Sequence, residues 1–443
     1  MTYRITVPFK GEGSGVEELT WAQFAGWRSM QKFGATEWTG GTMRLEEGTS
    51  VQDIATLLGF ILSRHQSLRT RLLVEDDGTP KQVLFESGEI TLEVHEDDGD
   101  PERMANAIRS EYEAAPWDPV ADWPLRMAVV ADGERAVYFV ALYCHIVIDG
   151  YGFDALRADL AKLDKATGAH LAPVAGVQPL DLARAQREPA ALRQHKASLR
   201  YWEKHLRVID PQRFAQPLTP QEERWWEATF TTPATHLGLK TLAARTKVHS
   251  GVILLAAYAV MLGRLSGRPM GVFRIAVSNR FRPGFAESVS NLAQAGLAVV
   301  DTTDCSFEEA IGRAWKSEVA AGMHAYYHPR DMWPLIDRIG QERGVEIDTR
   351  SYFNDRRFAA AQGPAGPLPE PDQIVAAVPR SNLRWGPRSN EIDATYFLNV
   401  DALPGAIDLT WRVDTTAISP ENLEACLRGI ESLVVTAALD NAR

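Results

Sequence analysis

Residues 136–152 read AVYFVALYCHIVIDGYG, an apolar run of strand length that leads into a histidine, an aspartate and two glycines. Successive side chains of a strand point to opposite faces, so a run that is apolar throughout predicts a strand covered on both sides in the middle of a sheet. His145 and Asp149 follow at its carboxyl end, where open α/β sheets commonly place ligands. A helix is predicted directly after the turn from apolar residues at helical spacing, Phe153, Leu156, Leu160 and Leu163.

Patterns on both sides of this stretch predict a mixed α/β fold. Apolar residues from Val51 to Leu62 recur at helical spacing, and Ser50 with Asp53 three residues later forms a capping-box start. Further strands are expected at 68–74, 81–85, 90–94, 271–277 and 396–398 and near Tyr352, and further helices at 237–265 and 307–321.

A chain of 443 residues is long enough for two domains of similar size. Between Gly168 and Pro179 the periodicity is lost, and two prolines and two glycines occur. We therefore expect an N-terminal lobe at 1–172 and a C-terminal lobe at 173–443. Residues 363–379 contain five prolines and two glycines, which predicts an irregular surface loop that could cover a site.

The composition excludes several classes of protein. A formal net charge of −11 opposes binding to phosphate backbones, so nucleic acid is not an expected partner. No apolar stretch has the length of a signal peptide or a membrane span, and we expect a cytoplasmic monomer without a membrane partner. Neither a disulfide framework nor a cysteine metal site is supported by three widely spaced cysteines, Cys144, Cys305 and Cys426.

Local basic groups remain within this acidic chain. They are ordinarily solvated faces, and a docking surface is the less common alternative. Two groups stand out, Arg184, Arg187 and Arg193 with Lys196, and the pair Arg356 and Arg357.

The turn after the apolar run is the strongest candidate for a reactive site. A histidine that ends a strand is by itself more often a hydrogen-bonded structural residue than a catalytic one. Here, however, the strand is apolar on both faces, and Asp149 lies beside Gly150, a residue that permits a tight turn. Such an aspartate can orient either the loop or the imidazole of His145.

Several motifs occur in a fixed order along the chain. Residues 144–150, Cys-His-Ile-Val-Ile-Asp-Gly, resemble the His-His-x-x-x-Asp-Gly motif of the condensation domains of nonribosomal peptide synthetases and their acyltransferase relatives. Other parts resemble further motifs of that family, at 19–23, 64–72, 201–206, 278–280 and 290–292, with looser fits at 328–331 and 353–354. The resemblance spans almost the whole chain.

The resemblance implies two lobes similar to chloramphenicol acetyltransferase, arranged as a V-shaped pseudo-dimer with a central tunnel. Carrier proteins would bring acyl and amine substrates on phosphopantetheine arms, and no cofactor would be bound. In that family an amine attacks the donor thioester through an anionic tetrahedral intermediate. The expected activity is therefore an acyltransferase that forms an amide bond in natural-product biosynthesis.

The resemblance also implies roles for individual residues. His145 would accept or share the proton that the attacking amine loses. Asp149 and Gly150 would shape the turn, and Arg280 would pair with Asp149. Tyr151, Asn354 and Asn399 are candidates for lining the tunnel. Arg64 and Arg69 are expected to fix the fold of the first lobe.

Two departures from the family pattern leave alternatives open. Cys144 stands where the family has its first histidine and Gly152 where it often has serine. Neighbouring strand residues face opposite sides, so Cys144 is expected to pack away from His145, and burial would blunt it as a nucleophile. The alternatives are an ester-forming acyltransferase with a free alcohol or amine acceptor, or a degenerate module that recruits carrier proteins or tailoring enzymes. No metal site is expected, because Pro329 ends any helix that would join His324 to His328.

Overall fold

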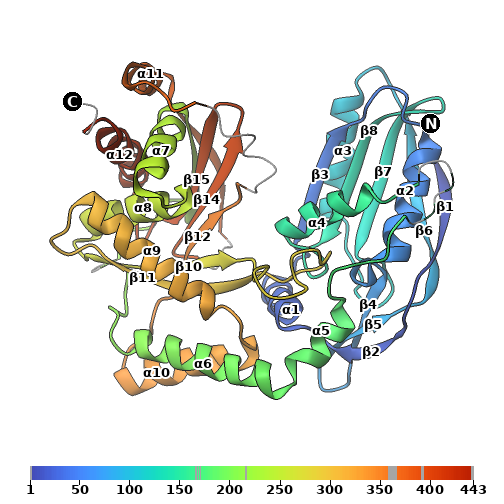
Figure 1. Cartoon of the computed structure of the whole chain (residues 1–443), viewed down its shortest axis with the longest axis horizontal. Coiled ribbons are helices and arrows are strands. Elements are labelled where there is room, and N and C mark those ends of the chain that lie inside the picture. The colour runs from blue at the N-terminus through green and yellow to red at the C-terminus, as the bar shows by residue number, and fades with distance from the viewer. Residues whose placement is uncertain are drawn as a thin grey trace. The chain divides into compact units, whose positions relative to one another are not determined.

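The computed structural model describes residues 2–164, 167, 169, 171–214, 217–357, 367–390 and 394–440 (Figure 1). Their contacts divide the chain into two compact units. The first unit contains Met1–Leu192 and Ser278–Ala293, and the second contains Arg193–Val277 and Gln294–Arg443. The second passage of the chain through the first unit brings Arg280 into it.

This division differs from the expected boundary between residues 172 and 173. The chain stays in the first unit up to Leu192, inside helix α6 (Pro189–Leu206). Helix α5 (Pro179–Gln186) packs on β2 (Gly15–Glu18), and the Gln186 side chain accepts a hydrogen bond of 2.9 Å from the backbone N–H of Trp21. The loss of periodicity between Gly168 and Pro179 therefore lies within the first unit and does not mark its end.

A five-stranded sheet in the order β1-β6-β7-β8-β3 is the base of the first unit. Its strands are β1 (Thr2–Lys10), β6 (Ser87–Glu96), β7 (Leu125–Asp132), β8 (Arg135–Cys144) and β3 (Trp38–Arg44). Only the β6–β7 pair is parallel among these neighbours. Strand β8 pairs with β7 on one side and β3 on the other, which confirms the predicted interior strand.

Both faces of this sheet are covered. Helix α2 (Val51–Arg64) packs with Met127 and Val129 of β7 in the main core of the unit. Helix α3 (Pro101–Ala114) packs with Ala128 and Val130, the alternate residues of the same strand, on the opposite face. The predicted capping box of α2 is present, since Ser50 and Asp53 exchange backbone-to-side-chain hydrogen bonds of 2.8 and 3.0 Å.

A small sheet and two further helices also belong to the first unit. Strands β2, β5 (Pro80–Leu84) and β4 (Thr70–Val74) form a small sheet in the order β2-β5-β4. Helix α1 (Trp21–Phe33) lies against the turn after β8, because Gly26 approaches the side chain of Ile146 closely. Helix α4 (Gly150–Leu160) follows that turn, as predicted.

A seven-stranded sheet in the order β11-β10-β12-β14-β15-β9-β13 is the base of the second unit. Its strands are β11 (Gln294–Asp301), β10 (Met270–Val277), β12 (Ser351–Asp355), β14 (Tyr396–Leu403), β15 (Ala406–Asp414), β9 (Trp225–Thr232) and β13 (Asn382–Ser389). Four helices cover one face around the buried Tyr258 and Trp411: α7 (Pro233–Thr246), α8 (Ser250–Ser266), α9 (Phe307–Met323) and α12 (Pro420–Leu439). Helices α6 and α10 (Pro329–Arg343) pack on residues of β10 and β11 through a separate core that contains Trp202.

The single helix predicted over 237–265 is wrong, because the structure has two. Helix α7 (Pro233–Thr246) and helix α8 (Ser250–Ser266) are bent by 108° at the break between them. Lys247 takes the left-handed conformation with φ of 58°, and the Thr246 hydroxyl donates back to the Leu242 carbonyl at 2.8 Å. Apolar periodicity continues across the break, so the sequence pattern did not indicate a turn. The turn is defined by the backbone conformation of Lys247 and the hydrogen bond of Thr246.

The prediction of an irregular loop over 363–379 also needs correction. Residues 363–366 lie outside the described part, but helix α11 (Pro371–Ala377) follows. Pro371 is in its first turn, where a missing N–H costs nothing, and Glu370 forms a capping box with Gln373. A proline-rich composition therefore did not exclude a short helix.

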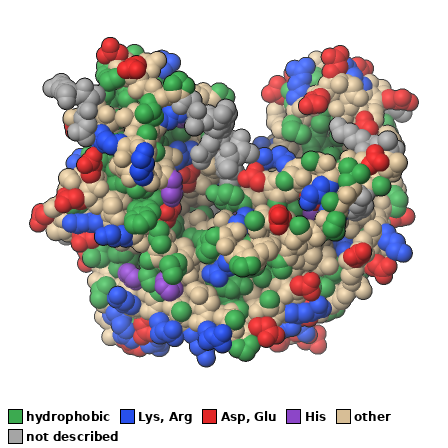
Figure 2. All heavy atoms as spheres, viewed as in Figure 1, with side chains coloured by type: hydrophobic (Ala, Val, Ile, Leu, Met, Phe, Trp, Pro, Cys, Tyr) green, Lys and Arg blue, Asp and Glu red, His purple; other side chains and the backbone are tan. Residues whose placement is uncertain are grey.

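Charged side chains of both signs are interspersed over the visible face of the molecule (Figure 2). Among the described residues no single helix is long and apolar enough to cross a bilayer. The bent pair α7 and α8 meets those criteria only when the two helices are taken together.

Candidate active site

The turn after β8 is anchored by its backbone. His145 donates its backbone N–H to the Glu37 carbonyl at 2.7 Å, next to the start of β3, and Val147 donates to the Cys144 carbonyl at 3.0 Å. The turn therefore begins where the two strands separate. Its side chains come from residues 145 to 149, all within the first unit.

The ring of His145 has a defined tautomer. Its Nδ1 lies 2.8 Å from the Ile148 carbonyl oxygen. A carbonyl can only accept a hydrogen bond, so Nδ1 must carry the proton and donate it. Among the described residues Nε2 has no hydrogen-bond partner, and the side chain is half-buried. In the neutral ring Nε2 is therefore a free proton acceptor.

Asn291 holds the main chain of the same histidine. Its side-chain amide donates a hydrogen bond of 2.8 Å to the His145 carbonyl. Asn291 belongs to the segment Ser278–Ala293, which is part of the first unit by its contacts. Both ends of the His145 backbone are thus fixed, the N–H by Glu37 and the carbonyl by Asn291.

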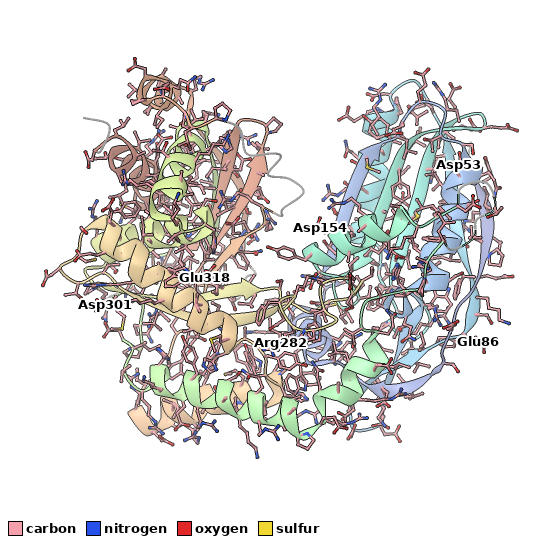
Figure 3. The ribbon with its side chains drawn as sticks, in the orientation of Figure 1. Asp53, Glu86, Asp154, Arg282, Asp301 and Glu318 are labelled. Atoms are coloured by element: carbon pink, nitrogen blue, oxygen red, sulfur yellow. The ribbon has the colours of Figure 1, made fainter. Side chains whose placement is uncertain are left out.

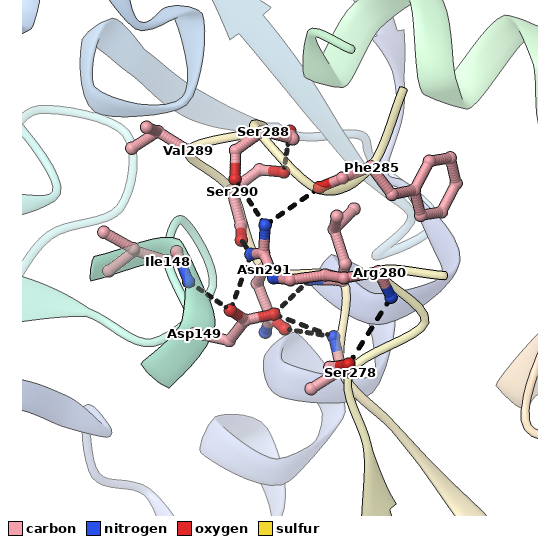
Figure 4. A network of polar contacts seen from close by, with 12 residues as sticks. Ile148, Asp149, Ser278, Arg280, Phe285, Ser288, Val289, Ser290 and Asn291 are labelled. Carbon is pink, nitrogen blue, oxygen red and sulfur yellow. Dashed lines mark hydrogen bonds and ion pairs between the residues drawn. The ribbon is translucent and has the colours of Figure 1, made fainter. Parts of the chain in front are cut away.

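Asp149 is buried and bonded through both carboxylate oxygens (Figure 4). Oδ1 accepts from the Gly152 N–H at 2.7 Å, which makes Asp149 the N-cap of α4, and from Arg280 at 2.7 Å. Oδ2 accepts from the backbone N–H groups of Leu292 at 2.8 Å and Ala293 at 3.1 Å. With these donors in place, Asp149 shapes the turn and has no oxygen directed at a substrate.

Arg280 binds Asp149, and the predicted pair is present. Its guanidinium also donates to the backbone carbonyls of Phe285 at 3.0 Å, Ser288 at 2.7 Å and Ser290 at 3.1 Å (Figure 4). The planar guanidinium thus binds several carbonyls of residues 285–290 at once and links this segment to the Asp149 carboxylate. The side chains of the pair are 9% and 3% exposed, so solvent screens this ion pair weakly.

Cys144 lies in the core. Its thiol is 3.8 Å from the sulfur of Met30, and the residue is fully buried. Burial raises the pKa of this thiol to about 12, so it is not a thiolate near neutral pH. The position that differs from the family motif is therefore occupied by a packing residue.

The glycines of the motif have distinct surroundings. Gly150 is the first residue of α4, and the neighbouring Tyr151 is partly exposed. At Gly152 a Cβ would lie 2.7 Å from Cγ1 of Ile148 and 3.1 Å from the carbonyl oxygen of Ser290. The serine that the family often has here would have to displace the Ile148 side chain and would crowd the Ser290 carbonyl.

Asn354 and Asn399, predicted to line a tunnel, lie in the second unit. They face each other on the parallel neighbours β12 and β14, and Asn354 donates its amide to Asn399 at 3.2 Å. They are half-buried. Their role as lining residues, like that of Tyr151, remains a prediction.

Two buried arginines, Arg64 and Arg69, bind other parts of the first unit. Arg64 makes hydrogen bonds of 2.5 and 2.8 Å to Asp159 in the last turn of α4. Arg69 donates to the carbonyls of Gly13, Phe85 and Glu12. Both therefore fix the fold of the first unit, as expected. Among the described residues no group of three or more His, Cys, Asp and Glu side chains could hold a metal ion.

Sequence reasoning missed the residues that hold the His145 backbone. The segment Ser290-Asn291-Leu292 resembled a family motif, but nothing in it indicated that the Asn291 amide binds the His145 carbonyl. Glu37 holds His145 through its backbone carbonyl, which any residue type would supply, so no sequence signal exists for this contact.

These features define a mixed α/β protein with a histidine at the end of an interior strand and a buried Asp–Arg pair beneath it. A family model, Condensation domain, matches residues 38–290, more than half of the chain. The chain belongs to the condensation domain family. The resemblance that the sequence motifs indicated is thereby confirmed.

Curated relatives are much longer than this chain. Cyclosporin synthetase simA of Tolypocladium inflatum is 26% identical over 244 residues, 54% of this chain and 2% of that protein. The isonitrile lipopeptide synthase of Mycobacterium tuberculosis is 26% identical over 332 residues, 68% of this chain and 12% of that protein. Phosphinothricin tripeptide synthetase PhsC of Streptomyces viridochromogenes is 29% identical over 258 residues, 55% of this chain and 23% of that protein. The chain therefore corresponds to a small part of each.

Solved structures confirm the fold. A structure on condensation domain-mediated chain release from the enacyloxin polyketide synthase matches with a TM-score of 0.73 and 20% identity, over 98% of this chain and 84% of that chain. SgcC5 protein from Streptomyces globisporus matches with a TM-score of 0.70 and 18% identity, over 95% and 98% of the two chains. The X-domain from teicoplanin biosynthesis matches with a TM-score of 0.68 and 18% identity, over 96% of both chains. The predicted class, a chloramphenicol acetyltransferase-like α/β fold, is thus confirmed.

Proposed function

We propose that the protein is an acyltransferase that joins a carrier-bound acyl or aminoacyl thioester to an amine, with His145 as the group that manages the proton. One observation carries this proposal: Nδ1 donates to the Ile148 carbonyl, which leaves Nε2 as the basic atom of the ring. The fixed backbone of His145 holds that atom in one place. Membership in the condensation domain family supports the reaction class.

The proposed reaction balances without a further reactant. The amine nitrogen attacks the thioester carbonyl carbon, the C–N bond forms, and negative charge develops on the carbonyl oxygen. Nε2 of His145 accepts the proton that the nitrogen loses. The C–S bond then breaks, and that proton passes to the thiolate that leaves. A general base of this kind contributes about 10²- to 10⁴-fold to the rate.

The proposal includes partners and location. Substrates would arrive on the phosphopantetheine arms of carrier proteins, so the chain itself needs no bound cofactor or metal. The parts for activation and carriage would lie on other proteins or domains, and the reaction would take place in the cytoplasm. The cysteine at position 144, where the family motif has histidine, supports the proposal of an active enzyme. Its side chain lies in the core and does not contact Nε2 of His145.

Intact-mass analysis of loaded carriers tests the proposal. Carriers loaded with an acyl group and with an amino acid are incubated with the wild-type protein, the variant His145→Gln and the control His95→Gln. His95 is also half-buried in the first unit, in β6, outside the site. We expect transfer of the acyl group to the amine with wild type and control, and a rate about 10²- to 10⁴-fold lower with His145→Gln.

Other outcomes decide between the alternatives. Transfer only to an alcohol acceptor would make the protein an ester-forming enzyme. Equal product formation by wild type and His145→Gln would remove the catalytic role of His145. No transfer by either, together with binding of the carriers, would favour a recruitment module.

A further inference from the structure

Exposed basic side chains form a row along α6 in the second unit. The buried side of this helix carries His195, Ser198, Trp202 and Leu206. The exposed side carries residues at spacings of three and four, Arg193, Lys196, Arg200 and Lys204. We call these four residues the α6 basic row. Within the described part of the chain none of them forms an ion pair, whereas Arg207 on the next turn pairs with Glu203 and Glu342.

The other basic residues singled out in the sequence are paired with carboxylates. Arg184 and Arg187 both pair with Glu17 at 2.7 Å. Arg356 pairs with Asp401, and Arg357 pairs with Asp355. The α6 basic row therefore differs from them in leaving its positive charge available.

An apolar row lies on the exposed side of α9. Trp315, Val319 and Met323 are four residues apart, so they lie on one face of the helix. They are 47%, 45% and 59% exposed. Single exposed apolar residues are common, but three large ones in line form a patch of the kind found at binding sites. We call these three residues the α9 apolar row.

The two rows meet at the end of α9. The side-chain amide of Gln194, next to Arg193, donates to the Met323 carbonyl at 2.7 Å. The ring of His324, the next residue, stacks on Tyr201 with centroids 4.5 Å apart. Arg200 precedes Tyr201 in α6 and therefore lies near this contact, and after burial and His205 it contributes to the lowered pKa of His324. The basic and apolar side chains are therefore parts of one surface.

We propose that the α6 basic row and the α9 apolar row form a docking surface for an acidic, helical segment of another protein. The argument is charge complementarity: an unpaired basic row on a chain of net charge −11 attracts an acidic partner, while the rest of the surface repels it. The apolar row would receive the apolar side of an amphipathic helix laid beside the basic row.

The surroundings favour a protein over other anionic partners. Around the apolar row, α9 carries charged side chains of both signs, Arg313, Lys316 and Glu318 (labelled in Figure 3), and Glu318 pairs with His249 at 2.9 Å. A bilayer or a nucleic acid presents negative charge uniformly, whereas a partner helix can place its acidic residues beside α6 and its apolar residues beside the α9 apolar row. The apolar row would gain nothing from a phosphate backbone.

Fluorescence anisotropy with the full chain tests this surface. The probe is a labelled helical peptide with glutamates on one face and leucines on the adjacent face, and lysines replace the glutamates in its counterpart. We expect only the glutamate peptide to bind, and its affinity to fall about tenfold or more as salt rises and screens the charges. The variant K196E/R200E should weaken binding at least tenfold, and Trp315→Ala about tenfold, equal to about 1.4 kcal/mol.

A matched variant and two other probes complete the test. K240E/R264E changes the charge equally at exposed helical positions of the second unit, outside the two rows, and should bind as wild type does. Circular dichroism checks that every variant is folded. The proposal is overturned if K196E/R200E binds the peptide as wild type does, or if both peptides bind equally. It is also overturned if anionic phospholipid vesicles or duplex DNA bind through the same residues and the glutamate peptide does not.

Discussion

The two ends of helix α4 each bury an aspartate beside an arginine, but the two carboxylates are bound differently. Asp149 at the first end accepts from Arg280 and from three backbone N–H groups, those of Gly152, Leu292 and Ala293. Asp159 at the last turn is contacted by side chains, those of Arg64, His65 and Lys162.

This difference separates two tasks. Backbone donors fix the path of the chain, so the Asp149 end defines the shape of the turn that holds His145. Side-chain donors tie one helix to another, so the Asp159 end anchors α4 to α2. Although burial raises the pKa of Asp159, its contacts with His65 and Arg64 lower it well below its usual range. The charged side chains at the Asp159 end therefore stabilise the contact between α4 and α2. The backbone hydrogen bonds at the Asp149 end set the conformation of the turn that carries His145.

The largest expected effect comes from Asp149→Asn compared with Asp159→Asn. In Asp149→Asn the new amide nitrogen would face either Arg280 or backbone N–H groups, so we expect a loss of about 3–5 kcal/mol in the free energy of unfolding and at least tenfold in acyl transfer. Asp159→Asn should lose a similar free energy, because Arg64 keeps a buried charge, but the folded protein should keep its activity within about threefold. Denaturant titration and the carrier assay measure both. Equal losses of activity would show that the two ends do not have separate tasks.

Gly152→Ala tests how tightly the first end is packed. A Cβ at this position would lie 2.7 Å from the Ile148 side chain and 3.1 Å from the Ser290 carbonyl. We expect a loss of about 1–3 kcal/mol in denaturant titration, as for other overpacked sites. The matched control is Gly312→Ala in α9, where no atom lies within 4 Å of the added Cβ, and it should stabilise the protein by about 0.5–1 kcal/mol. Equal effects would mean that Ile148 and the Ser290 carbonyl do not crowd position 152.

His65 gives the second end a pH dependence. Burial lowers the pKa of His65 more than Asp159 raises it, so the folded pKa lies below the unfolded value of about 6.5. The stability from His65 is therefore fully present above about pH 6.5 and is lost as the pH falls. We expect the free energy of unfolding of His65→Gln to depend less on pH between about pH 7 and 5 than that of wild type.

His249 is the control with the opposite sign. The hydrogen bond with Glu318 raises the pKa of His249, so its stability is present below about pH 6.5 and is lost as the pH rises. His249→Gln should therefore lose more stability at about pH 5 than at about pH 8. The same pH response in both variants would contradict the assigned directions.

The smallest expected effect on activity is that of Cys144→Ala. The thiol packs against Met30 and has a pKa raised to about 12 by burial, so its removal should leave acyl transfer within about threefold and cost about 1–2 kcal/mol. Iodoacetamide should label the half-buried Cys305 before Cys144 in the native protein. A loss of activity above tenfold would give Cys144 a catalytic role.

The local parts of the fold and site could be predicted from the sequence. The interior strand β8, the capping box of α2 and the helix after the turn all follow from short-range patterns, and the Asp149–Arg280 pair followed from the family motif. The break at Lys247, helix α11 and the hold of Asn291 on the His145 carbonyl could not be predicted. Each depends on a backbone conformation or on a contact between distant residues, which periodicity does not encode.

The return of residues 278–293 to the first unit has a consequence for synthesis of the chain. When Leu192 leaves the ribosome, the buried Asp149 still lacks Arg280 and the N–H groups of Leu292 and Ala293. The first unit can complete its hydrogen bonds only after about a hundred further residues have been made, at a rate that puts this delay at several seconds. A fragment that ends at Leu192 would keep this carboxylate without those partners. Dividing the gene at this boundary between the two units would therefore leave the first unit incomplete.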